Sequence, residues 1–90
     1  MSFTKIQEDI IRLVLEFNED PRDCIHEPCI EQIQTHFKNK YAPLEIEGNV
    51  LKLISKGVLE PYSYQSHLRF TERFRNKDNY RQLIKSLSYT

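Results

Sequence analysis

The chain has 90 residues, of which 39% are hydrophobic and 29% are charged, and its formal net charge is zero. This composition is too apolar for a disordered protein and fits one globular domain, which we expect to span residues 1–90. No stretch approaches the roughly 18 apolar residues of a membrane span, and the first residues do not resemble a signal peptide, so we expect an intracellular, cytoplasmic protein without membrane contact.

The charges are distributed unevenly along the chain. Residues 1–50 hold 5 Lys/Arg and 10 Asp/Glu, whereas residues 51–90 hold 8 and 3, so the two halves carry −5 and +5. Because opposite charges attract, we expect an anionic partner to contact the second half.

Apolar residues at steps of three and four predict three helices in the first part of the chain. The first begins near Thr4, with Gln7 as its capping-box partner, and ends at Asn18 before Pro21. The second begins at Pro28 and stops near Asn39. The third spans about residues 44–56, and its apolar side carries Ile46, Val50, Leu53 and Ile54.

The chain after the third helix changes its period. Gly57 suits the left-handed position that closes a helix, and Val58 to Glu60 predicts a short strand. His67 to Arg73 alternates apolar and polar residues, which predicts a returning strand and a hairpin over about residues 58–73. A closing helix is expected over about residues 78–88, with apolar positions Tyr80, Leu83, Ile84 and Leu87. The predicted class is mostly helical α+β, in the order helix, helix, helix, strand, strand, helix.

Two stretches resemble winged-helix (winged helix-turn-helix) DNA-binding domains. "IEGNVLKLISKGVLE" is similar to the third helix of that family, with Ile46, Val50 and Leu53 placed before Gly57 and followed by Leu59. "HLRFTERF" is similar to the returning strand of the family's hairpin, called the wing. The resemblance implies a helix-turn-helix fold in which the third helix is the recognition helix.

The resemblance also implies a small DNA-binding transcriptional regulator, cytoplasmic or nucleoid-associated, whose partner is double-stranded DNA. The third helix would enter the major groove, and the wing would contact phosphates. The expected DNA-binding residues are polar or cationic: Asn49, Lys52, Ser55, Lys56, Arg69, Arg73 and Arg75. Asn49 and Lys52 carry groups that can bond to base edges.

The alternative is a winged helix used as a protein-interaction module without direct DNA binding. The neutral net charge favours it, and so do Glu45 and Glu47, which would repel phosphates at the start of the third helix. Leu51, Tyr62 and Tyr64 are the expected contacts with a protein partner. A homodimer through the first and the C-terminal helices is a further expectation.

The sequence gives little support for metal binding or catalysis. Cys24, His26, Cys29 and His36 match no recognised zinc spacing, and Cys29 opens an amphipathic helix, where a small buried side chain is the commoner role. The chain contains no phosphate loop, nucleophile elbow or paired-carboxylate motif. We therefore expect no metal, no cofactor and no enzymatic activity.

Overall fold

A computed structural model describes residues 3–18, 29–61, 67–76, 78, 80–82 and 85 of the chain. The described part is mostly helical, with one two-stranded antiparallel sheet, so it belongs to the predicted α+β class. Its elements in chain order are α1 (Lys5–Asn18), α2 (Ile30–His36), α3 (Pro43–Ser55), β1 (Leu59–Pro61), β2 (Leu68–Phe70) and α4 (Glu72–Arg75).

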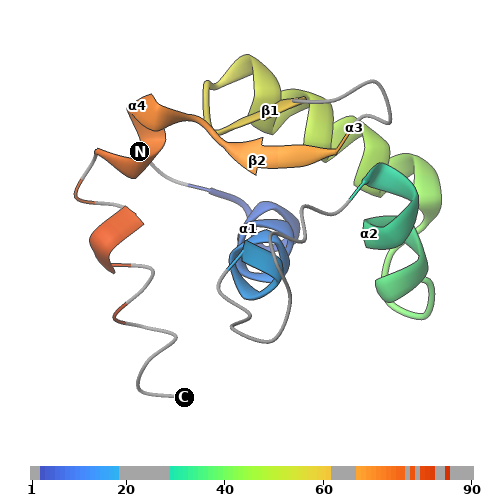
Figure 1. The fold of residues 1–90 in the computed structure, drawn as a ribbon. Helices are drawn as coiled ribbons and strands as arrows, with labels where there is room; N and C mark the ends of the chain where they lie inside the picture. Colours follow the sequence, from blue (N-terminus) through green and yellow to red (C-terminus); the bar gives the residue numbers. More distant parts are fainter. Residues whose placement is uncertain are drawn as a thin grey trace.

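Helix α1 lies at the centre of the molecule (Figure 1). The hairpin lies above it, with α2 and α3 towards one side and α4 towards the other. Every residue of α1 from Ile10 to Leu15 except Arg12 is buried. The rest of the core comes from the other elements and the α3–β1 turn: Ile33, Ile46, Val50, Leu53, Val58, Leu59, Leu68, Phe70 and Phe74.

Three helices begin with the same hydrogen-bonding device. A Gln or Glu side chain in the first turn accepts a hydrogen bond from the backbone N–H of the residue that precedes the helix, which is one half of a capping box. The bonds run from Thr4 N to Gln7 Oε1 (3.2 Å), from Cys29 N to Gln32 Oε1 (3.0 Å) and from Ala42 N to Glu45 Oε1 (3.2 Å). The predicted capping box of α1 is thus confirmed, and Glu45 has a structural role at the start of α3.

The turn between α3 and β1 depends on Gly57, whose φ is 77°. Gly57 N–H donates to the Ile54 carbonyl at 3.0 Å, and Val58 N–H donates to the Leu53 carbonyl at 3.0 Å. These two bonds make a Schellman motif, in which the residue after the helix takes the left-handed conformation. The predicted role of Gly57 is confirmed.

The hairpin pairs β1 with β2 in antiparallel register, with Leu59 opposite Phe70 and Glu60 opposite Arg69. His67, just before β2, also forms an antiparallel bridge with Cys29. Cys29 is the residue that precedes α2, so α2 begins at Ile30 and not at the predicted Pro28. The chain that enters α2 therefore lies against the hairpin, in the position of a short third strand.

The predicted strand over His67 to Arg73 is wrong in its second half. Strand β2 ends at Phe70, and Thr71 is the N-cap of α4, where its hydroxyl accepts a hydrogen bond from Phe74 N at 3.1 Å. The same hydroxyl donates to the carbonyl of Gly57, and Thr71 N–H donates to the Val58 carbonyl at 3.0 Å. A threonine hydroxyl at an N-cap satisfies a helix amide, so the chain turns into a helix here.

Helix α4 brings an unpredicted aromatic side chain into the core. Phe74 is buried, and its ring lies 5.3 Å from Phe70 and 5.9 Å from Tyr80, measured between centroids. Residues 78, 80–82 and 85 are also helical, within the predicted range 78–88. The predicted apolar positions Leu83, Ile84 and Leu87 lie outside the described residues.

Candidate functional site

The outer face of α3 carries two exposed leucines. Leu44 is 79% exposed and Leu51 is 55% exposed, and they are the exposed large hydrophobic residues of the described part of the chain. They are seven residues apart, which is within about 20° of two full helical turns, so they lie on one face of α3. Gly48 lies between the two leucines on the same face, and Ser55 lies beyond Leu51. We call these four residues the α3 ridge: Leu44, Gly48, Leu51 and Ser55.

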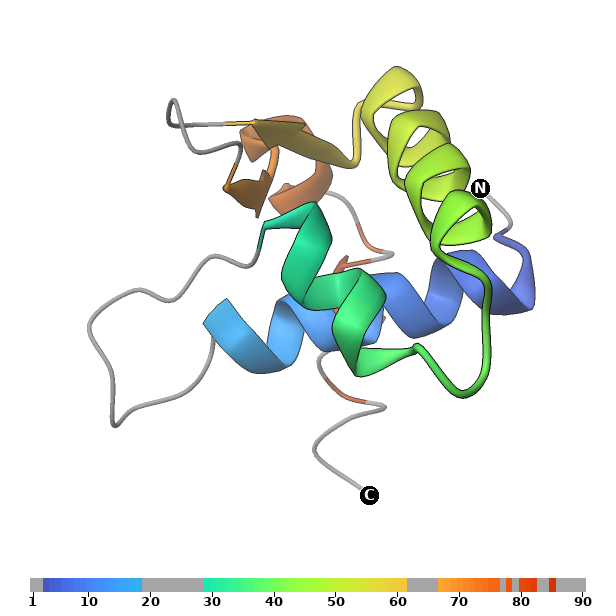
Figure 2. The ribbon, with the colours of Figure 1, turned by 90° about the vertical axis from the view of Figure 1, so that its right-hand side faces the viewer.

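Gly48 leaves an open space in the middle of the α3 ridge. A Cβ atom added there would meet no atom within 4 Å. A glycine in a helix interior lowers helix stability by about 1 kcal/mol relative to alanine, and no packing in the described residues requires it. Figure 2 shows that α3 runs along the edge of the molecule, with α1 and α2 on its inner side.

The charges beside the α3 ridge are segregated along the helix. Glu45 and Glu47 are exposed in its first half, Lys52 is exposed in its second half, and the exposed Lys56 follows its last residue. This order matches the helix dipole, since acidic groups are favourable near a helix N-terminus and basic groups near its C-terminus. The acidic half of α3 is the half that would read bases in a helix-turn-helix protein.

Asn49 and Lys56 point towards α1. The Asn49 side chain donates to the Glu45 carbonyl at 2.8 Å and accepts from Gln7 Nε2 at 3.2 Å. Lys56 Nζ donates to Gln7 Oε1 at 3.3 Å and lies 5.5 Å from the centroid of the Phe3 ring. Gln7 is only 3% exposed. Both expected DNA-binding residues thus take part in the junction between α1 and α3.

The expected wing cations lie in different surroundings. Arg69 Nε donates to Glu60 Oε1 on the opposite strand at 2.9 Å, in a half-exposed ion pair. Arg73 belongs to α4 and not to the wing, and its guanidinium approaches Gly57, where an added Cβ would lie 3.6 Å from Nη1. Arg75, on the same helix, is exposed, as are Lys52 and Ser55 on α3. The structure therefore brings Arg73 close to Gly57, at the C-terminal end of α3.

Among the expected contacts with a protein partner, only Leu51 lies within the described residues, and it is exposed. Tyr62 and Tyr64 lie outside the described residues. The sequence reasoning missed Leu44, the most exposed large hydrophobic side chain of the described part. Its spacing of seven residues from Leu51 is the signal that would have found it.

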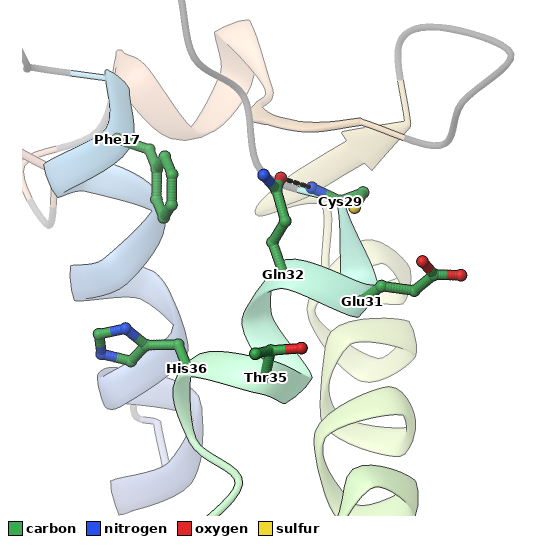
Figure 3. A pocket seen from close by; sticks show the side chains of 6 residues that line it. All are labelled: Phe17, Cys29, Glu31, Gln32, Thr35 and His36. Carbon is green, nitrogen blue, oxygen red and sulfur yellow. Dashed lines mark hydrogen bonds between the residues drawn. The ribbon is translucent and has the colours of Figure 1, made fainter.

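A shallow depression of about 470 Å³ lies between α1 and α2. Figure 3 shows Phe17 of α1 across from the side chains that complete the lining of the depression, which come from α2 and the residue before it: Cys29, Glu31, Gln32, Thr35 and His36. The Gln32 side chain is occupied by its bond to Cys29 N. Within the described residues, no three His, Cys, Asp or Glu side chains come together as metal ligands. Cys24 and His26, two of the four residues considered as zinc ligands from the sequence, lie outside the described residues.

A charged cluster ties the α2–α3 connection to α1. The Asp9 carboxylate, whose side chain is 10% exposed, accepts hydrogen bonds from Tyr41 OH (2.6 Å) and Lys40 Nζ (2.9 Å), and Lys5 Nζ lies at 3.3 Å. Burial raises the pKa of Asp9, but the hydrogen bonds from Tyr41, Lys40 and Lys5 lower it by more, and the pKa falls to about 2. The bond to Asp9 raises the pKa of Lys40 and that of Tyr41.

The comparisons with known proteins place the chain in no family. No protein-family model, no curated protein and no solved structure matches it. In the part of the chain that the structure describes, no helix combines the length and the apolar character needed to cross a membrane.

Proposed function

We propose that the chain is a winged-helix domain. The order of its elements supports this assignment, since three helices precede an antiparallel hairpin. The bridge between Cys29 and His67 supports it further, because it pairs the residue before α2 with the residue before β2, where a winged helix has its first strand. The Schellman turn at Gly57, which leads from α3 directly into β1, fits the same arrangement.

We further propose that the domain is a protein-interaction module whose contact surface is the α3 ridge. The observation that carries this proposal is the pair of exposed leucines, Leu44 and Leu51, on either side of Gly48. A single exposed leucine is ordinary on a protein surface. Two on one ridge, separated by a glycine with open space above it, suit the close approach of another protein's backbone or helix.

The same face is poorly suited to base reading. The α3 ridge offers one polar side chain, Ser55 at its C-terminal end, and Asn49 is bonded to Gln7 and to the Glu45 carbonyl. Glu45 and Glu47 add negative charge where a recognition helix approaches phosphates. The function best supported is therefore protein binding, and DNA binding is the second candidate.

Photo-cross-linking tests the first candidate. A photoreactive amino acid at position 51, introduced in the cells that make the protein, is expected to form a covalent adduct with a protein. The same group at Glu8, an exposed position of α1, serves as the control and should form none. The absence of any adduct from position 51, or an adduct with nucleic acid alone, would contradict the proposal.

The second candidate, DNA binding by the C-terminal half of α3, is favoured by the position of Arg73 beside Gly57, just after the half of α3 that carries the exposed Lys52 and Ser55. Affinity for a random duplex should then fall steeply with salt, and Lys52→Gln with Arg73→Gln should reduce the slope by about 1 for each lost phosphate contact. Lys38→Gln, on the α2–α3 connection, is the matched control. Binding that is undetectable at low salt would exclude this candidate.

A further inference from the structure

We infer that the α3 ridge binds a second copy of the same chain, with the two α3 helices antiparallel about a two-fold axis that passes close to Gly48. This inference rests on the proposed function, because it names the partner of the same surface. It differs from the expected dimer through the first and C-terminal helices. Helix α1 buries its apolar residues from Ile10 to Leu15 within the chain, and between Lys5 and Phe17 its exposed positions are the charged residues Lys5, Glu8 and Glu16.

The first argument is the symmetry of the leucines. In an antiparallel pair, residues equidistant from the axis on opposite sides meet each other. The positions 44 and 51 average 47.5, so an axis near Gly48 places Leu44 of one copy against Leu51 of the other, twice in the dimer. The large exposed surface of Leu44 would then be covered.

The second argument is the charge pattern beside the leucines. Glu45 and Lys52 are also seven residues apart, so they share one edge of the α3 ridge. Their positions average 48.5, which lies within one residue of the midpoint of the leucine pair. A two-fold axis normal to both helices keeps each edge facing its own copy, so Glu45 of one chain meets Lys52 of the other. The surface is therefore complementary to itself.

The same charges disfavour a parallel pair. In a parallel pair the two-fold axis runs along the helices, so each edge of the ridge meets the opposite edge of the other copy. Glu45 of one copy would then face Glu47 of the other, twice in the dimer, and both contacts would repel. The antiparallel arrangement replaces these contacts with two attractive ones and also opposes the helix dipoles. An unrelated partner would have to supply both an apolar ridge and this charge order, whereas a second copy already carries both.

Gly48 explains how the two helices can come close. The distance between packed helix axes depends on the side chains at the contact point, and small residues at the crossing allow the backbones to approach. A Cβ at position 48 would have no atom of the described chain within 4 Å, so an added methyl group would contact a partner and not the chain itself. On the opposite edge Glu47 lies near the same axis, so its two copies would repel and limit the affinity.

Disulfide trapping tests the geometry. In a chain whose native Cys24 and Cys29 are replaced by serine, Gly48→Cys should form a disulfide-linked dimer under mild oxidation. Ser55→Cys is the matched control, since it lies on the same exposed ridge but seven residues further, about 10 Å from the axis and about 20 Å from its own copy. Equal cross-linking of the two variants, or none for Gly48→Cys, would overturn the antiparallel dimer.

Charge reversal tests the pairing independently. Lys52→Glu should weaken self-association about tenfold, measured by sedimentation equilibrium, because each dimer contains the contact twice. The double variant Glu45→Lys with Lys52→Glu should restore self-association. Circular dichroism checks that this variant still folds without the capping bond of Glu45. A double variant that is folded but as weak as Lys52→Glu would overturn the pairing.

These results separate the partner from the proposed function. If the purified chain stays monomeric and Gly48→Cys does not cross-link, but position 51 is photo-cross-linked to a different protein, the inferred dimer is wrong and the interaction module stands. If position 51 forms no protein adduct at all, both fail.

Discussion

Helices α1 and α3 have nearly the same length, 14 and 13 residues, but they use their apolar side chains differently. Helix α1 buries Ile10, Val14 and their neighbours in the core, and between Lys5 and Phe17 its exposed residues are charged. Helix α3 buries Ile46, Val50 and Leu53, and leaves Leu44 and Leu51 in solvent. The apolar residues of α1 are thus accounted for by folding, whereas α3 carries two that folding does not use.

The largest expected effect is the loss of stability when a buried side chain of α1 is truncated, compared with an exposed one of α3. Ile10→Ala on α1 should lower the free energy of unfolding by about 2–5 kcal/mol, because it leaves a cavity where the native side chain is fully buried. Leu51→Ala on α3 should change it by less than about 0.5 kcal/mol. Urea unfolding of both variants provides the measurement, and a loss at Leu51 comparable to that at Ile10 would show that the exposed leucines serve the fold.

A second, smaller effect concerns Asp9 of α1, whose side chain is largely buried beneath its lysine partners. Because the folded pKa of Asp9 is about 2 and its ordinary value is 3.8, its hydrogen bonds stabilise the fold above about pH 4. This stability should be lost as the pH falls from about 4 to about 2, and we expect about 1–2 kcal/mol because the partner lysines are exposed and screened.

Thermal unfolding between pH 2 and pH 5 measures the effect of Asp9. Asp9→Asn should be less stable than the native chain above pH 4, and its stability should vary less with pH over this range. A native chain whose pH dependence equals that of Asp9→Asn would contradict the assignment.

The two glycines of the α3 region should respond in opposite directions. Gly57→Ala should lower stability by about 1 kcal/mol, since its positive φ disfavours a side chain. Gly48→Ala should raise stability by about 1 kcal/mol, because it improves a helix interior and meets nothing. If Gly48→Ala also weakens self-association, the glycine is retained for the contact; stronger self-association would contradict close packing at the axis.

The smallest expected effect is on the strength of self-association through α3. Glu47→Gln removes the repulsion between two copies near the axis, so self-association should strengthen about twofold to threefold, in line with the small energies of exposed charge pairs. Analytical ultracentrifugation at several concentrations detects such a change. Glu31→Gln on α2 is the control and should leave the association unchanged.

Local patterns predicted much of the fold. The apolar periods of α1 and α3, the capping box at Thr4 and the turn at Gly57 each depend on residues within one or two turns of the chain. The end of β2 was mispredicted because Leu68, Phe70 and Thr71 continue an alternating pattern, while the hydroxyl of Thr71 caps a helix. The bridge between Cys29 and His67 joins residues far apart in sequence and has no local signal.

The candidate site was less predictable than the fold. Leu51 was expected to be exposed, but Asn49 was expected to face DNA, and its engagement with Gln7 depends on how α1 and α3 pack. The same packing directs Lys56 towards Phe3. Side-chain chemistry alone does not distinguish a polar residue that faces solvent from one that joins two helices.

The buried amide of Gln7 links the start of the chain to its folding cooperativity. Gln7 caps the first turn of α1 and at the same time holds Asn49 and Lys56 of the α3 region, so that turn cannot open without releasing α3. Terminal turns ordinarily fray and exchange their amide hydrogens quickly. Here the amides bonded around Gln7 should exchange only when the whole domain unfolds, which makes the N-terminal turn part of the most slowly exchanging unit of the protein.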